Sequence, residues 1–431
     1  MQFSAIEAQY PKDFRREEQE QLIKHLSHRY SVQLIGMKRV GISNFLRFFL
    51  AQQAKNNKAA NELFVAIDLK DMVEREVYPF WILTFKRLAD AVQESATTRE
   101  IKQQMQSLFL QSIQSQDLFL LFDNLRVALQ VLVTNEIMPT LFFLRFDRMS
   151  DAFTAVFFDN IRRLRDVTNE KLTYVFTSYR HLEDLFPTAK TSIASLGQAM
   201  YIKPAKKEDM KIVYKTYEKM HYNFHLTQQA ENFLFDLVAG NMQYLQLALV
   251  ILNEKQTGTP RSSEELLSLL VSDERIMLQS EELWESVTRE QQAILLKIAK
   301  RQQITDKEKR KASYLWNTGF VTEEEKEVKI FSPLLLEYVI QQKNEQEEEA
   351  AVELTRKEHL LFHLLQDNLG EICDREQIIE TVWPEYQELG VSDWAIDRLV
   401  ARVRVKLKKQ KSHYQIMTVR TRGYKLTTVR E

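Results

Sequence analysis

The sequence is poor in the residues that cross-link chains or interrupt helices. Its 431 residues include one cysteine, Cys373, with 9 glycines and 8 prolines. A single cysteine excludes a disulfide within the chain and a cysteine-based zinc cluster, and it is typical of a reducing compartment. The scarcity of glycine and proline argues against a turn-rich all-β protein and favours helices.

Long apolar runs are also missing. No segment approaches the roughly eighteen uninterrupted apolar residues that indicate a membrane-spanning helix. Residues 1–20 carry charges early and contain no apolar core of signal-peptide length. We therefore expect a cytoplasmic protein that does not contact a membrane.

The charges are segregated along the chain although their sum is close to zero. The formal net charge is −1, but residues 391–431 contain 11 lysines and arginines against 3 acidic residues. Upstream, residues 343–353 include a run of glutamates, which we interpret as an acidic linker, although their composition also suits a continued helix. The C-terminal segment is thus a basic module.

Four short apolar segments are separated by helical stretches in the first half of the chain. They are residues 31–36, 63–69, 140–146 and 172–178. This alternation predicts a parallel α/β sheet in a domain spanning residues 1–205. With the domains that follow, the fold class is multidomain α/β plus winged helix.

The middle of the chain has helical spacing. Residues 206–280 are predicted to form a helical lid domain, with a Gly-started apolar helix at Gly240. Residues 281–342 combine helices, a Gly turn and a short hairpin-like segment. We interpret them as a first winged-helix-like domain.

Residues 354–431 have the order helix, helix, helix, hairpin. Thr355 and Glu358 form a capping box before the first helix, and Asp374 caps the second, which stops at Pro384. The third helix is expected to bury one apolar face, formed by Ile396, Leu399, Val400, Val403 and Leu407. Its largely outward residues are Trp394, Arg398, Ala401, Arg402, Val405 and Lys408. An amphipathic helix with arginines on its outer face suits the major groove of DNA.

This segment resembles the winged-helix effector domain of OmpR-type response regulators over residues 352–429. The matching positions are Leu354, Thr355, Lys357, Glu358, Gly370, Arg375, Trp383, the helix from Asp397 to Leu407, Thr418, Val419, Arg420, Gly423 and Tyr424. The resemblance implies that Arg402 and Arg404 face DNA from the recognition helix, and Thr418, Arg420 and Arg422 from the wing. On the side of the helix that the resemblance turns toward the bases, Trp394, Leu399 and Ala401 stand where polar residues are usual, so no base preference is transferred.

Residues 36–43 have the spacing of a P-loop between a strand and a helix. Gly36, Gly41 and Ser43 are in place, but Ile42 occupies the position of the phosphate-binding lysine. The glycines can still shape an anion-binding turn at a helix N-terminus. The cations of this loop are Lys38 and Arg39.

Residues 31–253 resemble the STAND and archaeal-type AAA+ ATPases, through the loop, the strand ending in FDR, the strand ending before Arg180, and the GN helix. The resemblance implies a Mg²⁺-organising acid and a catalytic glutamate after the third strand. Either Leu144 and Arg145 replace this pair, or Asp147 is the acid and Arg148 replaces the glutamate. Both alignments lack the glutamate, which predicts a pseudo-ATPase. The residues expected to contact a nucleotide that is retained without hydrolysis are Gly36, Lys38, Arg39, Gly41, Ser43, Asp147 and Arg180.

The primary hypothesis is therefore a DNA-binding regulator or scaffold with an inactive ATPase-like core, whose partner is double-stranded DNA. One rival is an ATP- or ADP-switched STAND-type regulator whose oligomerisation is controlled by the nucleotide, which would bind without hydrolysis. In that case the core would associate with itself or with another protein. Another is an adaptor whose winged helices bind proteins. No metal site is expected, because His359 and His363 have no cysteine or carboxylate partner in sequence.

Overall fold

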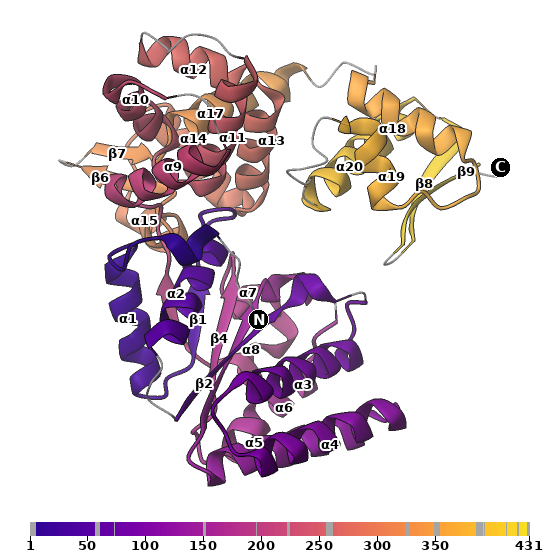
Figure 1. Ribbon diagram of the computed structural model, residues 1–431. Coiled ribbons are helices and arrows are strands. Elements are labelled where there is room, and N and C mark those ends of the chain that lie inside the picture. Colours follow the sequence, from indigo (N-terminus) through magenta and orange to yellow (C-terminus); the bar gives the residue numbers. More distant parts are fainter. Residues whose placement is uncertain are drawn as a thin grey trace. The chain divides into compact units, whose positions relative to one another are not determined.

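The computed structural model describes residues 6–56, 61–72, 74–149, 152–194, 196–221, 225–255, 262–324, 327–348, 354–384, 391, 393–410, 412–419 and 422–428. The chain divides into two compact units, Met1–Glu337 and Tyr338–Glu431 (Figure 1).

The first unit begins with a five-stranded parallel sheet. Its order is β2-β3-β4-β1-β5. The strands are β1 (Val32–Ile35), β2 (Glu62–Asp68), β3 (Met138–Leu144), β4 (Thr173–Ser178) and β5 (Gln198–Tyr201). Nearly all side chains of β1, β3 and β4 are buried, as expected of parallel strands covered on both faces.

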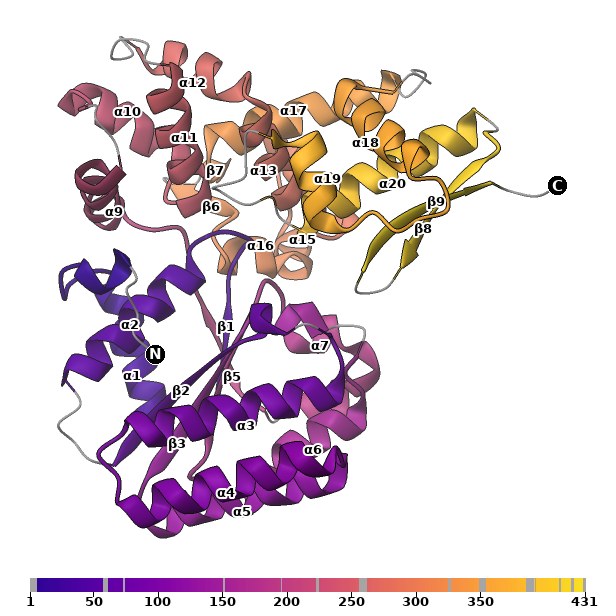
Figure 2. The ribbon, with the colours of Figure 1, turned by 45° about the vertical axis from the view of Figure 1, so that its right-hand side comes forward.

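Helices cover both faces of this sheet. They are α1 (Arg16–Ser27), α2 (Ile42–Asn56), α3 (Val77–Glu94), α4 (Arg99–Ser115), α5 (Leu118–Thr134), α6 (Ala155–Asp166), α7 (Leu182–Leu185) and α8 (Lys190–Ile193). Figure 2 shows α3 crossing one face, where α3 contacts β2 and α5 contacts β3, while α4 packs against α3 and α5. On the other face, Phe49 of α2 contacts Phe64 and Phe142 of the strands. The predicted α/β core is confirmed, whereas β5 was not predicted as a strand.

The rest of the first unit is mainly helical. Its helices are α9 (Lys207–His221), α10 (Gln228–Val238), α11 (Met242–Lys255), α12 (Ser263–Val271), α13 (Glu274–Glu285), α14 (Arg289–Ala299), α15 (Asp306–Lys311) and α16 (Ser313–Asn317). The antiparallel hairpin β6 (Val321–Glu324) and β7 (Glu327–Ile330) follows. Residues 289–330 thus place three helices before a hairpin, the order that a winged helix requires.

The predicted acidic linker is partly helical. Helix α17 (Pro333–Glu348) crosses the boundary between the two units and continues into residues 343–353. This is the alternative that its helix-favouring composition left open. The remaining residues of this segment, 349–353, lie outside the described residues.

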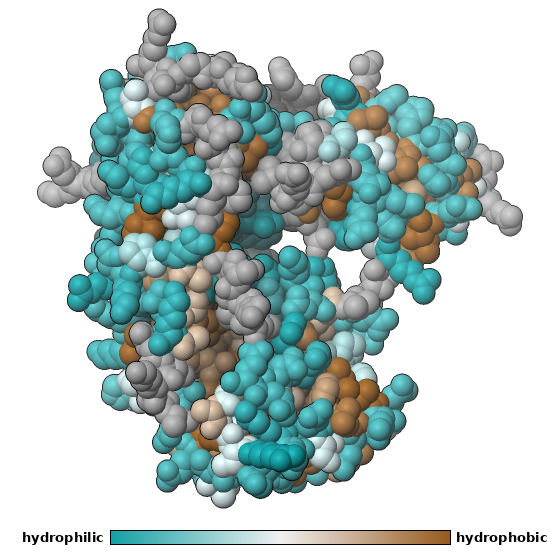
Figure 3. All heavy atoms as spheres, viewed as in Figure 1, coloured by the Kyte–Doolittle hydropathy of each residue, from teal (hydrophilic) through white to brown (hydrophobic). Residues whose placement is uncertain are grey.

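The second unit contains helices α18 (Arg356–Asp367), α19 (Arg375–Val382) and α20 (Asp393–Lys409), then strands β8 (Tyr414–Val419) and β9 (Gly423–Thr428). The two strands pair antiparallel. One core joins all three helices to the hairpin and includes Leu361, Ile378, Trp383, Val400 and Leu426. Apolar side chains are largely enclosed in this way, and most of the surface in Figure 3 is hydrophilic.

Candidate functional site

Helix α20 has one buried face and one exposed face. Ile396, Leu399, Val400, Val403 and Leu407 are buried in the core of the second unit. Their spacing follows the α-helical period, so the opposite face is left toward solvent. The prediction of a buried stripe is confirmed, but Leu399 is only 1% exposed and cannot face DNA as the resemblance implied.

Arg402 lies on one flank of α20, toward α18. Its Nε lies 3.8 Å from Oε1 of Glu358, and Lys406 Nζ donates to Oε2 of the same carboxylate at 2.8 Å. Glu358 is 2% exposed and also accepts from the backbone N–H of Thr355 at 2.7 Å. Burial opposes ionisation of Glu358, but these hydrogen bonds outweigh it and hold the pKa of the carboxyl below its usual value.

Arg404 lies on the opposite flank, toward the hairpin. Its Nε donates to the carbonyl oxygen of Ile416 at 2.9 Å, and a terminal nitrogen donates to Oγ1 of Thr418 at 2.8 Å. Side chains two residues apart in an α-helix point in directions that differ by about 200° around the helix axis. Arg402 and Arg404 therefore lie on different flanks of α20, where Arg402 forms an ion pair with Glu358 and Arg404 donates to the hairpin. That both arginines face DNA stays a prediction.

The centre of the exposed face carries other residues. Val405 and Lys408 are exposed, and Arg398 and Ala401 are partly exposed. The side chain of Trp394 lies outside the described residues. These positions recur every three or four residues, so they follow one stripe of α20.

The wing is the turn between β8 and β9. Thr418 and Arg422 are exposed there, whereas Arg420 lies outside the described residues. A cavity of about 530 Å³ lies between α20 and β8, lined by Arg404, Leu407, Lys408, Ser412, Tyr414, Gln415, Ile416, Met417 and Thr418. The helix and the hairpin thus present basic and polar groups along a shared groove.

A polar network holds α19, α20 and β9 together. Arg375 donates to Oδ1 of Asp397 at 2.5 Å, and the hydroxyl of Tyr424 bonds the same carboxylate. Burial and the adjacent Asp397 raise the pKa of Tyr424, so the phenol stays protonated. Cys373 pairs with Tyr424 through the backbone, which adds a short third strand segment to the hairpin.

In the first unit, the glycine loop lies between β1 and α2, as predicted. Gly41 has φ +106°, and a Cβ there would lie 2.7 Å from Cγ of Met242 at the start of α11. Arg39 also has a positive φ, +62°. The loop is therefore packed directly against the start of α11.

The two cations of the loop share one internal carboxylate. Glu282 of α13 lies 3.8 Å from Lys38 Nζ and 3.3 Å from Arg39 Nε, and it is 7% exposed. Lys38 also lies over the ring of Tyr179 at 4.9 Å. Burial lowers the pKa of Lys38, although Glu282 and Asp147 oppose this shift. An anion supplied by the chain thus occupies the neighbourhood of Lys38 and Arg39.

A cation follows β3, at the position where the resemblance implied an acid and a catalytic glutamate. Strand β3 ends at Leu144, and the next residue, Arg145, has φ +58° and pairs with Asp68 at the end of β2. The end of β3 therefore coincides with Leu144 and Arg145, the residues that one of the two alignments places at the acidic pair. Asp147 lies beyond it in a 3₁₀ turn, where burial raises the pKa of its carboxyl.

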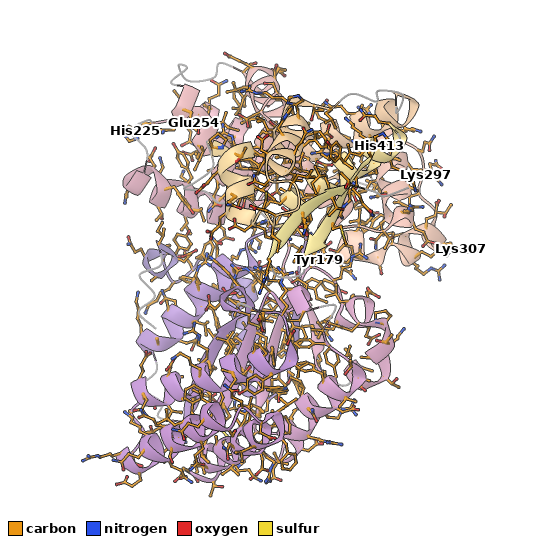
Figure 4. All side chains as sticks on the ribbon, turned by 90° about the vertical axis from the view of Figure 1, so that its right-hand side faces the viewer. Tyr179, His225, Glu254, Lys297, Lys307 and His413 are labelled. Carbon is orange, nitrogen blue, oxygen red and sulfur yellow. The ribbon has the colours of Figure 1, made fainter. Side chains whose placement is uncertain are left out.

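Arg180 is directed toward α13. Its Nε donates to the carbonyl oxygen of Ser286 at 2.9 Å. The adjacent Tyr179, at the carboxyl end of β4 (Figure 4), accepts from the hydroxyl of Tyr314 at 2.5 Å through its carbonyl oxygen. The end of β4 is thus tied to both α13 and α16.

The structure brings together Lys38, Arg39, Asp147 and Arg180 from the predicted nucleotide site, at the carboxyl edge of the sheet. Gly36 and Ser43 flank the same loop, with Ser43 in the first turn of α2. Glu282 was not predicted from the sequence, because no local pattern marks a carboxylate that lies 243 positions from Arg39 along the chain.

The described residues contain neither a cluster of metal ligands nor a helix that could span a membrane. Within them, no group of three histidine, cysteine, aspartate or glutamate side chains is placed to hold a metal ion. His359 and His363 approach each other, with their Nε2 atoms 3.1 Å apart. The helices of the same ranges include none with the length and hydropathy that crossing a membrane demands.

Both parts of the chain are similar to known proteins. Residues 347–426 match the family described as "Transcriptional regulatory protein, C terminal". Among solved structures, the chain is similar to the Walker-type ATPase of Pyrococcus abyssi, with 16% identity, 78% of this chain and 100% of that chain covered, and a TM-score of 0.46.

Two proteins of Aeropyrum pernix are also similar. The ORC2 protein in its ADPNP-ADP complexes has 11% identity over 78% of this chain and 95% of that chain, with a TM-score of 0.43. The ORC1 protein in complex with DNA has 14% identity over 77% of this chain and 92% of that chain, with a TM-score of 0.41. The P-loop NTPase-like architecture of the core is assigned from the strand order β2-β3-β4-β1-β5 and from the glycine loop between β1 and α2. Residues 347–426 are therefore identified as an OmpR-type winged helix of the transcriptional regulatory protein C-terminal family, joined to a P-loop NTPase-like α/β core.

Proposed function

We propose that this protein binds duplex DNA through its C-terminal winged helix, as a regulator or as a scaffold for a DNA-based assembly. The observation that carries the proposal is the exposed face of α20, which lies beside the hairpin in a segment that matches the regulatory family. Lys408 is exposed on that face, and Arg422 is exposed at the wing. Such a helix and turn are suited to one major groove and its flanking phosphates.

The test is a mobility-shift titration of the full chain on random duplex DNA at increasing salt. Each lysine or arginine that contacts a phosphate contributes about −0.9 to the slope of log affinity against log salt. Lys408→Ala should weaken binding and reduce this slope by about one. Lys307→Ala, at an exposed position of the first unit, is the matched control and should change neither quantity. Binding that is absent or independent of salt would refute the proposal.

We further propose that the core is a pseudo-ATPase. Ile42 supplies no charge at the position of the P-loop lysine, and Arg145 stands where a catalytic glutamate would follow β3. Glu282 already lies beside the two remaining loop cations. Phosphoryl transfer depends on positioned charge around the phosphates and the attacking water, and this set supports neither.

The corresponding experiment measures ATP and GTP hydrolysis by the full chain with and without DNA, beside the back-replacement Ile42→Lys. We expect background hydrolysis in both proteins and, at most, a gain of nucleotide binding in the variant. A restored lysine holds phosphates but does not orient water. Turnover by the unaltered chain in the presence of DNA would contradict the pseudo-ATPase proposal.

A further inference from the structure

The exposed face of α20 is apolar at its centre. Val405 is 54% exposed, and the preceding turn of the same stripe carries Ala401. On β8, Met417 is 51% exposed. The stripe lies opposite the buried residues of α20, so packing within the unit does not account for a large apolar side chain at Val405.

Arg402 and Arg404, the arginines on either flank of this centre, are directed away from it, whereas Arg398 and Lys408 lie further along the stripe in either direction. Arg402 lies against Glu358 of α18, and Arg404 bonds Ile416 and Thr418 of the hairpin. A guanidinium that read guanine would have to leave these acceptors first. The group that projects from the middle of the stripe is therefore the pair of methyl groups of Val405.

The major groove offers one apolar feature, the C5 methyl group of thymine. Guanine, cytosine and adenine present donors and acceptors there, which valine cannot satisfy. We propose that Val405 is a specificity-determining residue that contacts thymine methyl groups, so that the protein prefers duplexes with thymine at the positions facing the centre of α20. This inference rests on the proposed binding of duplex DNA by the winged helix.

The experiment compares the full chain on duplexes of equal length that differ only in this methyl group. One pair is alternating A·T DNA and the same sequence with uracil in place of thymine. The other pair is alternating G·C DNA with cytosine or with 5-methylcytosine, which carries a methyl group on the same ring carbon. Phosphate charge and base-pairing groups are unchanged within each pair, so electrostatic attraction cancels in the ratio of affinities.

We expect tighter binding to the methylated member of each pair, by about fourfold for each methyl group buried against Val405. Val405→Ala should bring both ratios close to one. Alanine favours helices more than valine does, and the position is exposed, so this variant should fold. Lys408→Ala should weaken binding to both members equally and leave the ratios unchanged.

The outcomes separate the inference from the proposed function. If the chain binds DNA but does not distinguish thymine from uracil, the role of Val405 is refuted while DNA binding stands. If Met417→Ala removes the ratios and Val405→Ala does not, the methyl contact belongs to the wing and our assignment is wrong. If no duplex is bound at all, the proposed function itself fails.

Discussion

Gly423 occupies a position where the hairpin approaches the preceding loop too closely for any side chain. Its φ is +139°, and a Cβ would lie 2.1 Å from the carbonyl oxygen of Cys373. That oxygen accepts the N–H of Tyr424 at 2.9 Å, so the two backbones cannot separate without losing a bond. Glycine is required here by contact as well as by conformation.

We predict that Gly423→Ala destabilises the second unit by about 2–5 kcal/mol, the sum of backbone strain and overpacking. The measurement is urea unfolding of the full chain, followed by hydrogen exchange in peptides from α20. Gly370→Ala is the control, since Gly370 has φ +88° but a Cβ added there would meet no atom within 4 Å. Its expected cost is about 1–2 kcal/mol of strain alone. Equal costs for the two variants would show that the close approach to Cys373 is unimportant.

Glu358 links α18 to α20 through its buried carboxylate. Its pKa is lower in the folded chain than its usual value, so its contribution to stability is complete above the pKa of the unfolded carboxyl. That contribution is lost as the pH falls through the lower pKa of the folded state. The pH dependence should therefore appear in the acidic range below the ordinary pKa of glutamate.

We predict that Glu358→Gln lowers the free energy of unfolding of the second unit by about 1–2 kcal/mol at neutral pH, because Lys406 and Arg402 lose their charged partner but stay partly hydrated. Unfolding of wild type and variant across the acidic range checks this. The two stabilities should converge as the pH falls. A difference that does not depend on pH would mean that the shape of the side chain, and not its charge, matters.

At the scale of elements, Arg404 joins the recognition helix to the wing. It is the residue of α20 that bonds two acceptors on β8. A flat guanidinium can reach both at once, which a lysine ammonium cannot do with the same geometry. The hairpin is therefore held in place relative to α20 by one side chain as well as by the shared core.

We predict that Arg404→Ala increases hydrogen exchange in β8 and β9, with a loss of about 1–2 kcal/mol in local stability. DNA affinity should fall as well, because the wing is no longer held beside the helix. Arg404→Lys should restore only part of the protection, and Thr418→Val should cost less, since it removes one of the two acceptors. Unchanged exchange in Arg404→Ala would show that the core alone positions the hairpin.

Helices and strands were predicted correctly where the local sequence pattern was strong. They were missed where their formation depends on pairing or packing with elements distant in sequence. The four strands with continuous apolar residues are present, because strands buried on both faces must be apolar along their length. Strand β5 has only four residues, two of them exposed, and pairs with β1 alone, so its own sequence carries little signal. Leu399 was placed on both faces of α20, and only the packing of the core showed that it is buried.

At the scale of the whole first unit, Glu282 connects the glycine loop to α13. It contributes the carboxylate that lies beside both Lys38 and Arg39, and Arg180 bonds the same helix end at Ser286. The loop, the end of β4 and α13 are thus held by charged and polar contacts. A phosphate at this loop would have to compete with Glu282 for the same cations.

We predict that Glu282→Gln increases the affinity for ATP by about tenfold, equivalent to about 1.4 kcal/mol, because two cations lose an internal anion. Hydrolysis should remain at background. Calorimetric titration with ATP is the measurement, and Glu285→Gln, at an exposed position of the same helix, is the matched control. An unchanged affinity in Glu282→Gln would show that Lys38 and Arg39 do not face a bound phosphate.

Local patterns in the sequence were sufficient to predict the α/β core, the order of elements in the C-terminal module and the location of the loop at residues 36–43. These features follow from the periodicity of apolar residues, from helix caps and from glycine spacing, all of which are local. The loss of charge at Ile42 is likewise visible in sequence. Such signals survive because each depends on residues only a few positions apart.

Which charged groups meet depends on how the elements pack, and it became visible in the folded chain alone. It placed Glu282 beside the loop, Asp68 beside Arg145, and Glu358 between Arg402 and Lys406. It also left Val405 at the centre of the exposed face of α20. Side chains with long stems reach partners on other elements, so their directions depend on packing between elements distant in sequence, which local periodicity does not encode.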